Sequence, residues 1–155
     1  MAGEVGLKHH QGTDVPVELL RSDYIVITQE ASGRILRQRR TSLGFANAAE
    51  AKATYGQAVA VYDRVGRTGR GLLVDSRLAP GRNDPDFEAV MSEFRRRALP
   101  GFAATAVLVQ SAAGRLQAQR ITRQDGTDQL VTSDEAAALA YLLLQAKGPP
   151  ARRLP

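Results

Sequence analysis

A polar loop that follows an apolar run carries the residues whose types and order favour recognition of a ligand or partner. Leu72–Val74 is apolar and ends at Asp75, and Asp84 with Pro85 begins a helical pattern. Sites in open α/β sheets lie at the carboxyl ends of parallel strands, and helix N-termini attract anions. We therefore take this loop and helix start as a candidate partner-binding surface, formed by Ser76, Arg77, Arg82, Asn83 and Asp84.

The same loop also has a structural interpretation, which we favour. Asp84, Asp86 and Glu88 already place negative charge at the helix start, so a phosphate is repelled there unless Arg77 and Arg82 outweigh them. No glycine-rich phosphate-binding motif is present. In this interpretation Asp84 caps the helix, and Arg77 or Arg82 pairs with the acidic residues.

A second basic group lies in the β-rich segment 33–40. Side chains alternate along a strand, so Arg37 and Arg39 are expected to share one face. Aromatic residues are not interleaved with the arginines, so the stacking platform of single-strand nucleic-acid binders is missing. We favour a guard against edge-to-edge aggregation on an edge strand. The alternative is a basic partner-binding surface formed by Arg34, Arg37, Arg39 and Arg40.

Few residues support catalysis or metal binding. The only histidines, His9 and His10, are adjacent in a segment that we expect to be flexible, which makes a poor metal site. The serines have no histidine base in the folded region, and cysteine is absent, so Ser-His-Asp hydrolysis and thiolate chemistry are excluded. Asp75 is expected to pair with Arg77 or Arg115. We therefore expect no enzyme activity, no cofactor and no metal.

The elements that must position these residues follow from the apolar periodicity. Two β-rich segments, 23–28 and 33–40, indicate a hairpin. Strands and helices then alternate, which implies parallel strands joined by right-handed crossovers. The expected helices span residues 48–65, 85–98, 112–126 and 133–146, and the expected strands span 70–75, 104–110 and 129–132.

The order β-β-α-β-α-β-α-β-α predicts a single-domain α/β fold, with helices packed on a mixed sheet. We assign residues 22–147 to this domain. Residues 1–21 are expected to form a flexible N-terminal arm, and residues 148–155 a disordered tail.

Length and composition indicate one globular domain of 155 residues with a net charge of +5. Of the 21 basic residues, only Lys8, Lys52 and Lys147 are lysines. The excess of arginine either serves acidic partners or reflects codon usage, and the sequence leaves both open. No apolar stretch approaches the ~18 residues of a membrane span, and no signal-peptide pattern is present. We expect a cytoplasmic protein without membrane insertion.

Three stretches within residues 23–145 resemble the STAS-domain superfamily: "GRGLLVDSRLAPGRNDPDFE", "TAVLVQSAAGRLQAQR" and "QLVTSDEAAALAYL". This superfamily includes bacterial anti-sigma-factor antagonists and their STAS-like relatives, and its fold is near that of CRAL-TRIO lipid carriers. The resemblance implies a STAS-like fold. In phosphorylated antagonists a Ser or Thr lies at the start of the helix after the central strand. Here the matching positions, 83–86, read Asn-Asp-Pro-Asp, and Ser76 does not match the phosphoacceptor. The phosphorylatable serine is therefore missing.

Two classes of function remain open. The resemblance implies a non-catalytic, cytoplasmic protein–protein interaction module in bacterial signalling or scaffolding, whose partner is another protein, acidic if the arginines serve it. The alternative is a carrier of a small ligand, a lipid or nucleotide, which requires an internal apolar pocket. Nucleic acid is disfavoured as a partner, and homo-oligomerisation is left open.

Overall fold

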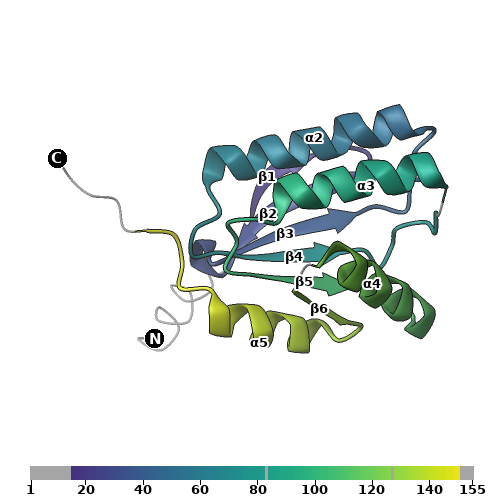
Figure 1. Ribbon diagram of the computed structural model, residues 1–155. Coiled ribbons are helices and arrows are strands. Elements are labelled where there is room, and N and C mark those ends of the chain that lie inside the picture. The colour runs from purple at the N-terminus through teal and green to yellow at the C-terminus, as the bar shows by residue number, and fades with distance from the viewer. Residues whose placement is uncertain (1–14, 83, 127, 151–155) are drawn as a thin grey trace, which may run out of the picture.

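Six strands form one mixed sheet whose spatial order is their order along the chain (Figure 1). The computed structural model describes residues 15–82, 84–126 and 128–150. The strands are β1 (Val17–Arg21), β2 (Ile25–Glu30), β3 (Ile35–Arg40), β4 (Gly71–Asp75), β5 (Ala104–Leu108) and β6 (Gln129–Thr132). The first three are antiparallel neighbours, and β3 to β6 run parallel.

Helices cover both faces of the sheet. They are α2 (Ala48–Val65), α3 (Pro85–Ala98), α4 (Ala112–Asp125) and α5 (Glu135–Gln145), and the 3-10 turn η1 (Ala31–Gly33) joins β2 to β3. The helices α2, α3 and α4 each join neighbouring parallel strands. Because every right-handed crossover advances in the same direction, these three helices lie over one face. Helix α5 follows the last strand and packs on the opposite face (Figure 1). There Leu142 belongs to the same core as Leu73 and Leu108.

The larger core lies between the sheet and helices α2 and α3. Tyr62 is fully buried, and its hydroxyl donates a hydrogen bond of 2.6 Å to the Oε1 atom of Gln38. The rings of Tyr55 and Phe94 pack with their centroids 4.7 Å apart. Burial of these large side chains joins the two helices to the strands and stabilises this face of the sheet.

Local sequence sets the start of each α-helix. The side chains of Asn47, Asp84, Ser111 and Asp134 each accept a hydrogen bond from the backbone N–H three residues further on. These bonds satisfy N–H groups that have no partner within the helix. The expected cap at Asp84 is confirmed.

The prediction of a flexible arm over residues 1–21 is wrong for its last part. Residues Val17–Arg21 form β1, the edge strand paired with β2. A register shift between Glu18 and Leu20 breaks the alternation of apolar and polar residues, so the strand has no clear period in the sequence. Leu19 and Leu20 pack against the larger core. Residues 1–14 lie outside the described part of the chain, and with them His9 and His10.

The predicted tail begins with a residue held to the body of the domain. The backbone N–H of Gly148 donates a hydrogen bond of 2.7 Å to the carbonyl oxygen of Gly69. Residues 151–155 lie outside the described part of the chain. Within the described residues, no helix combines the length and apolar character that a membrane span requires.

Candidate functional site

Two regions at the carboxyl ends of the parallel strands collect polar and charged side chains, one on each face of the sheet. On the face of α5 lies a group that we call the charge cluster: Glu30, Arg37, Arg39, Asp75, Arg77 and Glu135. On the opposite face a cleft lies between α3 and α4, which we call the α3–α4 cleft.

The charge cluster is built from short ion pairs. The guanidinium of Arg77 donates hydrogen bonds of 2.8 Å to Asp75 and 2.8 Å to Glu135. Arg37 donates a bond of 2.8 Å to Glu30 and reaches Glu135 at 3.4 Å. Only 8% of the Arg37 side chain and 4% of the Asp75 side chain are exposed. The cluster therefore ties β2, β3 and β4 to the first turn of α5.

These contacts lower the pKa values of two acidic residues of the cluster, Asp75 and Glu135. Burial disfavours the charged carboxylate of Asp75, but the hydrogen bonds and positive charge of Arg77, with Arg37 behind them, lower the pKa of Asp75 below its ordinary value. The pKa of Glu135 is lowered in the same way: burial opposes the charge, and Arg37 and Arg77 outweigh burial.

The charge cluster satisfies its own charges and holds no excess for a ligand. Three arginines face three carboxylates, and the two most buried members, Arg37 and Asp75, lie 3.8 Å apart. A buried charge whose partner is present contributes to the unique packing of the domain, and removal of that partner leaves it unbalanced. The expected pair of Asp75 with Arg77 is confirmed, and so is the shared face of Arg37 and Arg39.

The candidate surface on the loop after β4 does not form one patch. Arg77 belongs to the charge cluster, whereas Ser76 lines the α3–α4 cleft on the other face. Arg82 lies beside α3, where it pairs with Asp84 at 2.5 Å and donates a bond of 2.8 Å to the carbonyl oxygen of Phe45. This pair is the self-contained arrangement that the sequence favoured. Asn83 lies outside the described residues.

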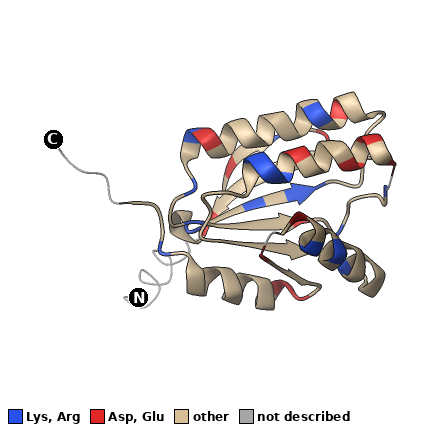
Figure 2. Ribbon diagram, viewed as in Figure 1, with Lys and Arg blue, Asp and Glu red and all other residues tan. Residues whose placement is uncertain are grey.

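The prediction that the second basic group lies on an edge strand is wrong, because β3 is an interior strand with β2 and β4 on its two sides. Figure 2 shows the basic residues of β3 in blue on this strand. Arg37 and Arg40 are buried, with 6% and 5% of their surfaces exposed, so they do not form an outer basic surface. The guanidinium of Arg34 donates to the last carbonyl oxygens of α5, among them Leu143 at 2.9 Å. Of the four arginines in this basic group, only Arg39 is exposed.

The α3–α4 cleft is a cavity of about 490 Å³ with an apolar floor. Val107 and Val109 form the floor from β5, Phe87 and Met91 line it from α3, and Ile121 lines it from α4. The cleft exists because α4 packs loosely: none of the described residues of α4 is buried. Its volume lies in the ordinary range for small-molecule sites.

Positive charge predominates along this cleft. The charged residues that line it are Arg40, Arg82, Arg95, Arg120, Glu88 and Asp125. Arg40 is buried, and its described partners are the carbonyl oxygens of Tyr24 and Leu43, the hydroxyl of Tyr55 and the ring of Phe45 rather than a carboxylate. Among the described residues, Arg120 also forms no ion pair. An anion is therefore the favoured occupant of the polar part of the cleft.

The sequence predicts some of the residues that line this cleft but not all of them. The sequence points to Ser76 and Arg82 and predicts that Arg40 lies on a basic strand, but it does not single out Arg120. The available signal was the composition of residues 112–125, where alanine, glutamine and arginine outnumber large apolar residues. A helix without an apolar stripe cannot seal the sheet beneath it.

The comparisons with known proteins concern the fold. No family model matches the chain, and no curated protein matches it. Among solved structures, the chain is similar to an uncharacterized protein of the DUF3478 family from Shewanella loihica PV-4, described as having a SpoIIAA-like fold. The two sequences are 11% identical, and the match covers 83% of this chain and 96% of that chain with a TM-score of 0.58.

This similarity shows the fold of the chain. The chain has a SpoIIAA-like fold. The expectation of a single-domain α/β protein with a mixed sheet is confirmed.

Proposed function

We propose that the chain is a non-catalytic binding protein that holds a small amphipathic anion in the α3–α4 cleft. The observation that carries the proposal is the combination of an apolar floor, formed by Val107 and Val109, with cationic walls at Arg40 and Arg120. Apolar lining with a few convergent polar groups is the usual composition of small-ligand sites. The cleft also supplies the apolar pocket that a carrier of small ligands requires.

A non-catalytic role is supported by the chemistry of the residues around the cleft. Its polar groups are arginines, amides, Ser76, Ser92, Tyr55 and two carboxylates, and no histidine is among the described residues that line it. Among the described residues, neither serine hydroxyl is hydrogen-bonded to a carboxylate or a histidine that could activate it as a nucleophile, and that of Ser92 accepts a bond from Arg96. The arrangement is suited to holding a charged head group and an apolar body.

The first test is the identity of the bound molecule. The purified protein is extracted with organic solvent, and the extract is analysed by mass spectrometry; an amphipathic anion at near-stoichiometric amount is expected. In parallel, dodecanoate, dodecanol and dodecylamine are compared for displacement of anilinonaphthalene sulfonate. We expect dodecanoate to bind most tightly, because its head group complements Arg40 and Arg120. Equal affinities for the three compounds would contradict the proposal.

A pair of variants locates the binding site. Arg120→Gln removes a cation that lines the cleft, whereas Arg115→Gln removes an exposed arginine of the same helix that does not line it. We expect Arg120→Gln to weaken dodecanoate binding about tenfold, the equivalent of one charge-assisted hydrogen bond of roughly 1.4 kcal/mol. Arg115→Gln is expected to bind like the wild type. Equal effects of the two substitutions would mean that the anion binds to the general positive charge of α4.

A second candidate is an interaction module for a protein partner in bacterial signalling or scaffolding. Leu43 and Leu78 favour it, because both lie in loops at the carboxyl end of the sheet and are 49% and 58% exposed. Exposed apolar side chains next to polar loops are typical of recognition surfaces. If a pull-down from the source organism captures a partner, Leu78→Asp should abolish capture and leave dodecanoate binding unchanged. Retained capture of the partner together with a loss of dodecanoate binding would exclude this surface.

A further inference from the structure

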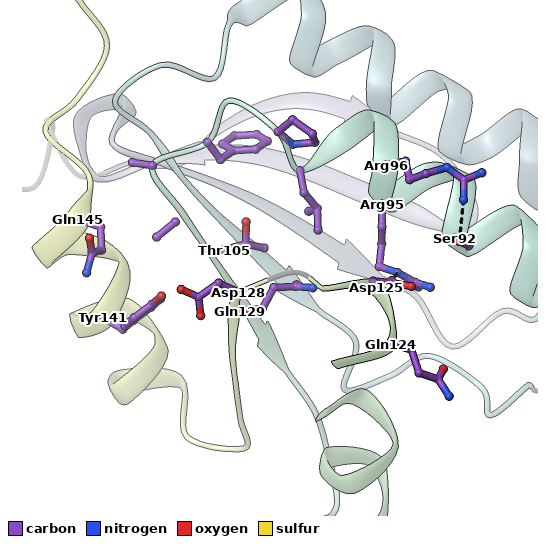
Figure 3. Close-up of a pocket in the computed structure, with 15 residues that line it drawn as sticks. Ser92, Arg95, Arg96, Thr105, Gln124, Asp125, Asp128, Gln129, Tyr141 and Gln145 are labelled. Atoms are coloured by element: carbon purple, nitrogen blue, oxygen red, sulfur yellow. Dashed lines mark hydrogen bonds and ion pairs between the residues drawn. The ribbon is translucent and has the colours of Figure 1, made fainter. Parts of the chain in front are cut away.

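The α3–α4 cleft ends at an ion pair, and a second cavity begins on the other side of it. The second cavity has a volume of about 860 Å³ and lies near the amino ends of β5 and β6 (Figure 3). Four residues line both cavities: Ser92, Arg95, Gln124 and Asp125. The two cavities therefore meet where Arg95 of α3 and Asp125 of α4 form their ion pair.

The floor beneath the two cavities is continuous. Val107 and Val109 line the first cavity, and Thr105 lines the second. Thr105 and Val107 are alternate residues of β5, and Val109 directly follows the strand, where its N–H donates to the carbonyl oxygen of Thr132 at 3.0 Å, so the three side chains follow one another along one face. The segment from Thr105 to Val109 spans about 13 Å, at roughly 3.3 Å per residue. A linear chain that enters the α3–α4 cleft is thus directed along β5 toward the ion pair.

The second cavity offers further apolar surface to such a chain. Leu99, Phe102 and Ala104 line it, together with the ring of Tyr141 from α5, which Figure 3 shows on the side opposite α3. The pair of Arg95 with Asp125 stands between this surface and the cleft. The two side chains are 19% and 22% exposed, so the pair is partly shielded from water.

We infer that the ion pair of Arg95 with Asp125 is a specificity determinant that limits the length of the ligand by closing the end of the α3–α4 cleft. This inference rests on the proposed function. A ligand whose apolar chain fills the cleft is accepted, and a longer chain meets the ion pair. When both side chains of the pair are truncated, the two cavities join, and longer chains are accommodated.

The experiment measures how affinity depends on chain length. Saturated carboxylates from octanoate to stearate displace anilinonaphthalene sulfonate from the wild type and from the double variant Arg95→Ala with Asp125→Ala. We expect wild-type affinity to rise about fourfold for each buried methylene, equivalent to roughly 0.8 kcal/mol, and to stop rising at intermediate length. In the double variant the rise should continue to longer chains.

A matched control removes an ion pair elsewhere without changing the net charge. Arg21 and Glu18 form an exposed pair on β1, and Arg21→Ala with Glu18→Ala should leave the wild-type length profile unchanged. If the first double variant does not fold, as judged by circular dichroism, Arg95→Gln with Asp125→Asn shortens the arginine side chain and removes the ion pair that holds the two side chains across the end of the cleft. This second pair should shift the profile in the same direction.

The outcomes are distinct. Identical length profiles in the wild type and both cleft variants would overturn the length limit and leave the proposed function standing. A loss of affinity at every chain length in the variants would also overturn it, because the pair would then contact the head group. If the wild type binds none of the carboxylates, the proposed function itself fails.

Discussion

The charge cluster and the α3–α4 cleft lie at the same end of the parallel strands but on opposite faces, and they differ in how their charges are satisfied. In the cluster, Arg37 and Arg77 face Glu30, Asp75 and Glu135 at hydrogen-bond distance. In the cleft, the described residues give Arg40 and Arg120 no carboxylate partner. Balanced charge stabilises a fold, whereas unbalanced charge next to an apolar floor is suited to binding. The difference separates the structural residues from the candidate binding residues.

The reason for the difference lies in the helices above each region. The first turn of α5 brings Glu135 over the sheet, and the helix buries Ala138 and Leu142. Helix α4 has no buried residue among those described. A helix with an apolar stripe closes its face of the sheet, and a helix without one leaves a gap.

The largest expected effect breaks the charge cluster. Asp75→Asn removes the buried carboxylate that accepts from Arg77 at 2.8 Å and lies 3.8 Å from Arg37, so three arginines then face only two carboxylates. We expect the free energy of unfolding to fall by about 3–5 kcal/mol. Urea denaturation followed by circular dichroism measures the loss.

Asp63→Asn is the control for this substitution, because the Asp63 side chain is 63% exposed in its pair with Arg67. A change within about 1 kcal/mol is expected there. Equal losses for the two substitutions would mean that the cluster is no more important than a surface ion pair.

Two phenylalanines of α3 distinguish the core from the wall of the cleft. Phe94 is buried against Tyr55, whereas Phe87 is only partly buried and lines the cleft. Phe94→Ala should lower the free energy of unfolding by about 3–5 kcal/mol. Phe87→Ala should lower it by less than about 2 kcal/mol, because less apolar surface is lost. Thermal unfolding of the two variants compares their stabilities. A larger loss of stability for Phe87→Ala than for Phe94→Ala would mean that Phe87, and not Phe94, is the core residue of α3.

Acid should destabilise the domain through the charge cluster. The pKa of Asp75 is lowered in the folded state, because Arg77 and Arg37 outweigh the effect of burial. A carboxyl with a lowered folded pKa contributes stability above its unfolded pKa of about 4, and that stability is lost as the pH falls through the folded pKa. The urea concentration at the denaturation midpoint should therefore decrease as the pH is lowered below about 4. The fall should be shallower in Asp75→Asn, and parallel curves would contradict the assignment.

The smallest expected effects on stability concern two exposed arginines. Arg120→Gln in the cleft and Arg39→Gln at the margin of the cluster should each change the free energy of unfolding by less than about 0.5 kcal/mol. Arg120→Gln alone should weaken dodecanoate binding, because Arg39 lies on the other face of the sheet. Isothermal titration calorimetry measures the two affinities. A loss of binding in Arg39→Gln would move the site to the cluster.

The sequence by itself determined the order of the elements and the start of α3. Apolar periodicity predicts α2 at residues 48–65 with the bounds that the structure has, and Asp84 with Pro85 predicts the first turn of α3. These features depend on residues close together in the chain, and local hydrogen bonds and propensities decide them. The pairs of Asp75 with Arg77 and of Arg82 with Asp84 were also predictable, because each joins residues two positions apart.

Tertiary structure alone decided what the arginines do. Strand β3 pairs with β2 on one side and with β4 on the other, so it is an interior strand, and Arg37 and Arg40 become buried on opposite faces. Arg37 then contacts Glu135, nearly a hundred residues away in the chain. Arg40 lines a cleft whose far wall is α4. Such contacts depend on which strands are neighbours and on how closely each helix packs. Both properties follow from the burial of the whole sheet rather than from any short segment.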